Sequence, residues 1–139
     1  MPVSINGSCL RKSIQYTIES DVVATANCHC NTCKKSTGAA FQTVTVAREK
    51  SFKLNSGKEN LKTFDISDKA VKSFCGVCGT PIYNTHQDFP GFNMVFVGSL
   101  DEPCRLSPTT NFFCERMLPW VNTIDELENV ARLREQVRE

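Results

Sequence analysis

The chain carries the stretch Cys28-His29-Cys30-Asn31-Thr32-Cys33 and, further along, the stretch Cys75-Gly76-Val77-Cys78-Gly79. These two stretches place five thiols in two short segments, and such C-x-C and C-x2-C spacings bring sulfur atoms close together. Because no apolar signal segment follows Met1, we expect a reducing compartment, in which clustered thiols bind metal more often than they form disulfides. The two stretches therefore predict zinc binding.

The overall composition is typical of one domain. The chain has 139 residues, of which 40% are apolar, so it can bury a core without relying on metal for its folding. We expect a single domain over residues 1–139, with its core at about 4–121. Sixteen Lys and Arg residues against fifteen Asp and Glu leave a net charge of +1, which predicts no binding to nucleic acid or to a membrane surface. No apolar run approaches the roughly 20 residues of a membrane span, so we expect a cytoplasmic protein.

Short stretches of alternating apolar and polar residues predict a mainly β fold. The expected strands are a hairpin over residues 4–18 and the segments 22–26, 41–46, 52–54, 61–66, 71–74, 81–83 and 92–97. Segment 61–66 alternates poorly and is expected at the edge of a sheet. Residues 31–35, inside and just after the first cysteine stretch, leave room for about one helical turn.

The last part of the chain predicts an α-helix over about 123–138. Thr123 and Glu126 have the spacing of a capping box at a helix N-terminus. Apolar residues then recur every three or four positions, at Ile124, Leu127, Val130, Leu133 and Val137. We expect this amphipathic helix to close the domain.

Three thiols of the first stretch, those of Cys28, Cys30 and Cys33, suit a catalytic zinc ion. Catalytic zinc has three protein ligands and one open tetrahedral position, which a water or a substrate thiol can occupy. A thiol bound there would lose its proton and become a nucleophile near neutral pH. Lys34 and Lys35, which follow directly, are weak candidates for binding an anionic substrate and equally suit a solvated surface.

The second stretch suits a structural zinc ion. Cys75 and Cys78 can fold around one turn, in which Gly79 tolerates a positive φ, and Cys9 is a natural third ligand at the end of a strand. His29 is expected not to bind metal, because its side chain should point away from those of its two cysteine neighbours.

Three runs of sequence resemble one known family. They are Gly7-Ser8-Cys9, Cys28 to Phe41 (CHCNTCKKSTGAAF) and Phe74 to Tyr83 (FCGVCGTPIY). Their order and content resemble the glutathione-dependent formaldehyde-activating enzyme family, which also contains centromere protein V. The resemblance covers most of the chain from Gly7 to about Trp120.

This resemblance implies a fold, two metal centres and an activity. The implied fold is one of coiled antiparallel sheets, related to methionine sulfoxide reductase B. The implied catalytic zinc is three-coordinate and the implied structural zinc is four-coordinate; the ligands are Cys28, Cys30 and Cys33 for the first, and Cys9, Cys75 and Cys78 for the second. The implied enzyme is a carbon-sulfur lyase that joins glutathione and formaldehyde to S-(hydroxymethyl)glutathione.

The chain departs from the family pattern at Arg11, where the family usually has a second cysteine two positions after the first. The structural centre then lacks a ligand unless Cys104, Cys114 or His86 replaces it. Alternatively, the Arg11 guanidinium could lie against the thiolates of Cys75 and Cys78. A third possibility is one closed site of four thiolates, which leaves no catalytic zinc. Its ligands would be Cys30, Cys33, Cys75 and Cys78, with Cys9 and Cys28 left over. We expect one or two zinc ions per chain, with the second site weakened or absent.

Other residues are expected to be structural. The aromatic side chains of Phe41, Tyr83, Phe92, Phe96 and Trp120 are expected in the core, and Cys104 and Cys114 are expected to be small buried apolar residues.

The predicted function is thus an enzyme that activates a glutathione-like thiol for addition to a small electrophile. The alternatives are a zinc-stabilised binding module without catalysis and a redox protein that works by thiol exchange.

Overall fold

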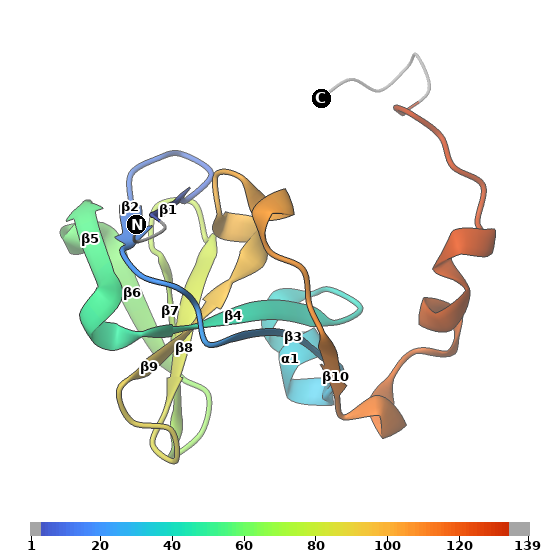
Figure 1. The fold of residues 1–139 in the computed structure, drawn as a ribbon. Helices are drawn as coiled ribbons and strands as arrows, with labels where there is room; N and C mark the ends of the chain where they lie inside the picture. The colour runs from blue at the N-terminus through green and yellow to red at the C-terminus, as the bar shows by residue number, and fades with distance from the viewer. Residues whose placement is uncertain (1–3, 134–139) are drawn as a thin grey trace.

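Two β-sheets, shown in Figure 1, form the body of the protein in a computed structural model that describes residues 4–133. The strands are β1 (Ile5–Ser8), β2 (Gln15–Ile18), β3 (Ala24–Cys28), β4 (Gln42–Arg48), β5 (Phe52–Ser56), β6 (Leu61–Asp65), β7 (Ala70–Cys75), β8 (Pro81–His86), β9 (Phe92–Phe96) and β10 (Thr110–Phe112). The α-helix is α1 (Asn31–Thr37), and the 3-10 helices are η1 (Glu49–Ser51), η2 (Lys58–Asn60), η3 (Val97–Ser99), η4 (Pro103–Arg105), η5 (Cys114–Arg116) and η6 (Pro119–Glu126). None of the helices within residues 4–133 has both the length and the apolar character needed to cross a membrane.

The smaller sheet has the strand order β1-β2-β5, and the larger sheet has the order β10-β3-β4-β9-β8-β7-β6. Neighbouring strands are antiparallel, except that β10 lies parallel to β3. Parallel neighbours require a long connection, and here the whole of residues 29–109, from α1 to η4, lies between β3 and β10. The prediction of a mainly β fold is confirmed, as are the strand pattern, the edge position of β6 and the short helix after the first cysteine stretch.

Residues from both sheets form the core. The fully buried side chains include Ile14 just before β2, Tyr16 and Ile18 in β2, and Ile82 and Val95 in the larger sheet. This alternation of buried and exposed positions along β2 is what its sequence pattern predicts.

Tyr16 is the largest of these buried side chains and links several elements. Its ring stacks on Phe52 with 4.8 Å between ring centroids, and its hydroxyl lies 2.6 Å from the Ser99 hydroxyl. Burial raises the pKa of the Tyr16 phenol well above its usual value. A Cβ at Gly7 would overlap the Tyr16 ring, so glycine is required where β1 crosses it.

Two expectations about buried residues are wrong. Trp120 is 47% exposed, because it lies on η6 outside the core, whereas Phe96 is buried as expected. Cys104 and Cys114 are both exposed, since they lie on the short helices η4 and η5 rather than in strands that face the core.

The predicted α-helix over about 123–138 is also wrong as far as the structure describes that segment. η6 is a 3-10 helix that ends at Glu126, Thr123 inside it has non-helical dihedral angles, and residues 127–133 form no helix. The remaining residues, 134–138, lie outside the described part of the chain. In Figure 1 the red segment runs away from the sheets, and Leu127, Val130 and Leu133 are each more than half exposed. An isolated helix of this length is marginal in water without a surface for its apolar face.

Candidate metal centres

The first group of thiols, here called the first triad, consists of Cys28, Cys30 and Cys33. Cys28 is the last residue of β3, Cys30 is the N-cap of α1, and Cys33 lies in the first turn of that helix. The backbone N–H of Cys33 donates to the Cys30 sulfur at 3.3 Å, as the side chain of an N-cap residue accepts from the helix. The junction between a strand and a helix thus turns three thiols toward one point.

The sulfur atoms of the first triad all lie within 4.8 Å of one another, and all three side chains are half-buried. The Cys33 thiol donates to the Cys28 sulfur at 3.1 Å, and the Cys28 sulfur lies 3.5 Å from that of Cys30. Around zinc, with Zn–S bonds of about 2.3 Å, tetrahedral sulfurs lie about 3.8 Å apart. The first triad therefore fits a zinc ion with only small movements of the side chains.

Hydrogen bonding between the thiols separates their acidities. The bond donated by Cys33 lowers the pKa of the Cys28 thiol to about 5, against the opposing effect of burial. The same bond raises the pKa of the Cys33 thiol, because Cys33 must keep its proton to donate it. In the absence of metal, Cys28 is thus a thiolate at neutral pH, whereas its partner Cys33 keeps its proton.

His29 lies between two members of the first triad in the sequence, but its ring is not among the candidate metal ligands. Its ring is 1% exposed and packs against Phe41, with 5.0 Å between ring centroids. Its Nε2 donates to the Asn111 side-chain oxygen at 3.1 Å. His29 therefore anchors strand β10 beside the triad.

Strand β10 is the feature near the triad that sequence reasoning missed. Its residue Phe112 pairs with Cys28, and the Phe112 carbonyl accepts from the backbone N–H of His29 at 3.0 Å. Asn111 also accepts from the side chain of Asn27 at 3.0 Å. All three residues of β10 are exposed, so the sequence of this strand shows no alternation of buried and exposed positions that could predict it. The polar side chain of Asn111, which accepts hydrogen bonds from Asn27 and His29, was the remaining signal.

The two lysines of the sequence prediction have different surroundings. The Lys34 ammonium donates to the backbone carbonyl of Arg116 at 2.7 Å, so it holds η5 against α1. Lys35 instead lines a groove of about 680 Å³ between α1 and the strands β6 and β7.

This groove combines apolar and cationic side chains. Phe64, Ile66 and Phe74 contribute apolar surface, and Lys35 and Lys72 contribute positive charge. Burial lowers the pKa of the Lys72 ammonium, which donates to the Ser36 carbonyl at 2.6 Å. The groove shares helix α1 with the first triad, although no cysteine lines it within the described residues.

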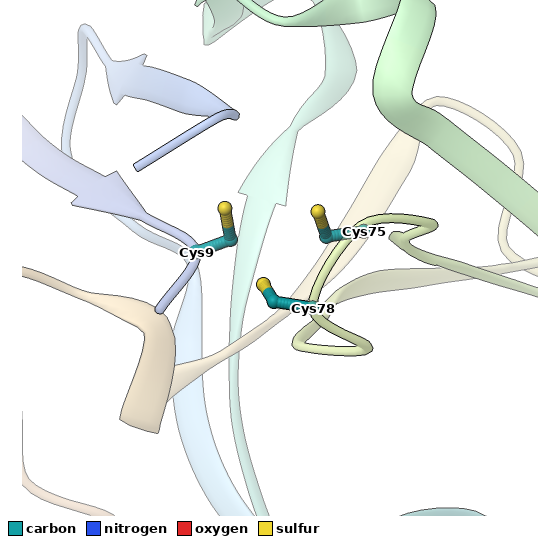
Figure 2. A group of neighbouring side chains, drawn as sticks. All are labelled: Cys9, Cys75 and Cys78. Atoms are coloured by element: carbon teal, nitrogen blue, oxygen red, sulfur yellow. The ribbon is translucent and has the colours of Figure 1, made fainter. Parts of the chain in front are cut away.

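The second group of thiols, here called the second triad, consists of Cys9, Cys75 and Cys78, and Figure 2 shows their sulfurs converging. Cys9 follows β1, Cys75 ends β7, and Cys78 lies in the turn before β8. Their sulfur atoms also lie within 4.8 Å of one another, and Cys9 and Cys75 are almost fully buried. Gly79, with φ of +80°, closes the turn by donating to the Cys75 carbonyl at 2.8 Å. Three thiols at this spacing, two of them buried and that of Cys78 half-buried, suit zinc as well as the first triad does.

Hydroxyl groups and backbone amides surround these sulfurs. The Thr80 hydroxyl, 3.3 Å from Cys78, is the main cause that lowers the pKa of the Cys78 thiol to about 6. Burial raises the pKa of Cys9, but hydrogen bonds from Ser13 and from the backbone N–H of Ile14 outweigh it, so the net shift is downward.

None of the residues suggested as a replacement ligand lies in the second triad. The group contains neither Cys104 nor Cys114, which are exposed elsewhere. His86 instead accepts from the backbone N–H of Asp88 at 3.1 Å. Arg11 is exposed, and its side chain makes no hydrogen bond or ion pair with a described residue. The structure also keeps Cys30 and Cys33 in a different group from Cys75 and Cys78, so it does not bring together the four-thiol site.

The chain resembles known proteins in both sequence and fold. A family model described as "Glutathione-dependent formaldehyde-activating enzyme" matches residues 4–116. The fold is similar to the crystal structure of a Rhodobacter sphaeroides protein, a structural genomics target, with a TM-score of 0.63 and 19% sequence identity. That similarity covers 76% of this chain and 98% of the other, and at this identity it shows a shared fold alone. No curated protein matches the chain.

Proposed function

The chain belongs to the glutathione-dependent formaldehyde-activating enzyme family, and from this membership we propose that it is a zinc-dependent enzyme of the carbon-sulfur lyase class. It would join a small thiol such as glutathione to formaldehyde or to another small electrophile. The observation that carries the proposal is the convergence of three half-buried thiols from one short segment, within 4.8 Å of one another. Such a set of donors holds a metal ion and leaves it one free position.

The first triad would hold the catalytic ion, and each of its residues has a part in this. The hydrogen bond from Cys33 already lowers the pKa of the Cys28 thiol, and the N-cap bond of Cys30 fixes the direction of the Cys30 sulfur. Zinc bound there would lower the pKa of a substrate thiol, so that this thiol is a thiolate near neutral pH. In the reaction the substrate sulfur forms a bond to the carbonyl carbon, the carbon-oxygen π bond breaks, and the proton lost by the thiol ends on that oxygen.

The groove beside α1 is the proposed site for the charged part of the thiol substrate. Glutathione carries two carboxylates, and Lys35 offers positive charge among apolar side chains. The Lys72 ammonium adds positive charge nearby, although it already donates to the Ser36 carbonyl. The Lys34 ammonium instead donates to the Arg116 carbonyl.

Substitution of the two lysines tests the groove, with Lys34 as the matched control. Lys35→Gln should raise the KM for glutathione several-fold with little change in kcat, and Lys34→Gln should change KM less. Equal effects of the two variants would remove the groove from the proposal.

A direct turnover measurement tests the proposed activity. NMR exchange spectroscopy measures the rate at which glutathione and formaldehyde form S-(hydroxymethyl)glutathione. The protein concentration must be high enough for the catalysed rate to exceed the spontaneous one. We expect acceleration by the zinc-loaded protein and its loss in Cys30→Ser, whereas Cys104→Ser, which changes an exposed thiol outside both triads, should keep it. A zinc-loaded protein that accelerates none of several thiols with several aldehydes would contradict the proposal.

Thiol exchange is the second candidate function, because one observation favours it. The sulfurs of Cys28 and Cys33 are 3.1 Å apart, and one of them is a thiolate in the absence of metal. A peroxide could take two electrons from this pair to form a disulfide and water. Zinc release and the loss of two thiols after mild peroxide, both reversed by a dithiol reductant and zinc, would support this role over the lyase.

A further inference from the structure

The hydroxyl of Ser13 lies against two sulfurs of the second triad. Its oxygen is 3.4 Å from the Cys9 sulfur and 3.6 Å from the Cys75 sulfur. Ser13 is half-buried, and these two cysteines are 2% and 0% exposed, respectively. A single oxygen atom thus touches both buried thiols of a three-thiol group.

These two distances match the edges of a zinc coordination tetrahedron. With Zn–S bonds of about 2.3 Å and a Zn–O bond of about 2.0 Å, an oxygen and a sulfur ligand lie about 3.5 Å apart. The two distances from Ser13 fall on either side of this value. The oxygen therefore stands where a fourth ligand would stand relative to two of the three thiolates.

The backbone around Ser13 is held in place by residues far away in the sequence. The turn between β1 and β2 closes through a bond from the Lys12 N–H to the Cys9 carbonyl at 2.9 Å, with Lys12 in the left-handed region at φ of 58°. The Asn60 side chain donates to the Ser13 carbonyl at 3.1 Å, and a Cβ at Gly57 would overlap that carbonyl. Such fixing of a side chain that faces a metal is what a ligand requires.

Other polar groups near the second triad are less suitable. Of the three sulfurs, the Thr80 hydroxyl bonds to that of Cys78 alone, at 3.3 Å, and it also accepts from the Leu10 N–H at 3.0 Å. Arg11 stands at the position of the expected fourth cysteine, but it is exposed, and a guanidinium has no lone pair to give to a metal. Ser13, two residues further on, is the donor that the turn directs inward.

We propose that the second triad binds a zinc ion through the thiolates of Cys9, Cys75 and Cys78 and the hydroxyl oxygen of Ser13. On binding, the three thiols release their protons to solvent, whereas the Ser13 oxygen coordinates through a lone pair and keeps its proton. The departure at Arg11 then changes the donor set from four sulfurs to three sulfurs and one oxygen. This inference rests on metal binding at the second triad and not on the turnover proposed for the first.

Cobalt(II) spectroscopy tests the proposal, because the visible spectrum of cobalt reports its ligands. The full chain is used with Cys28→Ser and Cys33→Ser, which leave the first triad one thiol, and circular dichroism verifies the fold. We expect one cobalt ion per chain with a four-coordinate spectrum. Ser13→Ala should change the visible bands and weaken cobalt binding by at least about tenfold. Ser13→Cys, nearly isosteric, should increase the thiolate-to-cobalt charge-transfer absorption and tighten binding.

Thr80→Val is the matched control, since it removes a hydroxyl that contacts a sulfur of the same triad without being the proposed ligand. Because it keeps all four proposed ligands, it should change the visible bands less than Ser13→Ala does. Unchanged bands in both Ser13 variants would overturn the proposal, as would equal changes in Thr80→Val and Ser13→Ala. Absence of cobalt binding in the parent protein would overturn it through its premise, and turnover by the intact protein would show separately whether the first triad works. If Ser13→Ala does not fold, the result of Ser13→Cys decides alone.

Discussion

At the scale of single residues, the two triads differ in the partners of their sulfurs. The thiols of the first triad bond mostly to one another and to the backbone N–H of Cys33. Those of the second triad also receive hydrogen bonds from Ser13, Thr80 and the backbone N–H groups of Ile14 and Val77. A thiolate with such protein donors is less nucleophilic, which suits structure, whereas the first triad keeps its sulfurs available for exchange.

Zinc content tests the metal assignment of the first triad. Cys28→Ser should lower the zinc content of the purified protein by one ion per chain, because two thiols hold zinc much more weakly than three. Elemental analysis measures it. Cys114→Ser is the control, since this exposed thiol lies outside both triads, donates to the Asn111 carbonyl, and should leave the zinc content unchanged. Zinc retained in full by Cys28→Ser would exclude this triad as the site.

The acidity of Cys28 gives a pH-dependent prediction for the metal-free protein. Alkylation of Cys28, followed by mass spectrometry of its peptide, should titrate with a pKa of about 5. In Cys33→Ala the main donor is gone, so the pKa should move up toward the ordinary thiol value. Equal profiles in the two proteins would contradict the hydrogen bond.

The same lowered pKa predicts how stability depends on pH. The folded pKa of Cys28 lies below that of the unfolded chain, so its stabilising effect is complete above the unfolded value. This contribution is lost as the pH falls toward about 5. Urea unfolding of the metal-free protein between these limits should show it, and Cys33→Ala should weaken the dependence.

Which cysteines come together could be predicted from spacing alone for the first triad, because its members lie in six consecutive residues. For the second triad, the C-x2-C spacing predicted only Cys75 and Cys78. Cys9 was added because it lies at the end of a strand that could pair nearby, and the family resemblance implies the same three ligands. Long-range packing explains why Ser13 was missed: nothing local distinguishes its hydroxyl from that of Ser8, which instead bonds to Asp101.

At the scale of elements, β10 is the piece that completes the surroundings of the first triad. Its backbone pairs with β3, and its Asn111 side chain accepts from both His29 and Asn27. The strands with alternating patterns were predicted because half-buried strands require that alternation. β10 could not be predicted, because exposed side chains leave only its backbone and polar bonds to hold it.

Removal of the Asn111 side chain tests this role. Asn111→Ala leaves the buried Nε2 of His29 without its partner, which should lower the free energy of unfolding by about 1–3 kcal/mol. Chemical denaturation measures the loss. The matched control is Asn55→Ala, which removes an exposed bond to Thr17 and should cost no more than about 0.5 kcal/mol. Equal losses in the two variants would show that β10 is not anchored through His29.

At the scale of the whole molecule, the apolar residues near the C-terminus have helical spacing in the sequence, but they do not form the helix that this spacing predicts. The side chains of Leu127, Val130 and Leu133 recur at helical spacing and are nevertheless exposed. Periodicity predicts which face would be buried in a helix, but it does not supply the surface that must cover that face.

Substitution of these apolar residues should therefore leave the stability unchanged. The triple variant Leu127→Ser, Val130→Ser, Leu133→Ser should have the free energy of unfolding of the parent protein within about 0.5 kcal/mol. Ile82→Ala, at a fully buried position, should lose about 2–5 kcal/mol in the same denaturant titration. A large loss in the triple variant would mean that these residues are covered in solution.

The second triad also joins distant parts of the chain. A metal ion that ties Cys9 to Cys75 closes a loop of nearly half the sequence, whereas the first triad closes only the few residues from Cys28 to Cys33. If such a tie persists after unfolding, it restricts the conformational entropy of the unfolded chain by about 4 kcal/mol for the long loop, against about 2 kcal/mol for the short one. The first centre would then serve reactivity, and the second would serve as a cross-link. Loss of metal from the second triad would first lower the melting temperature of the protein.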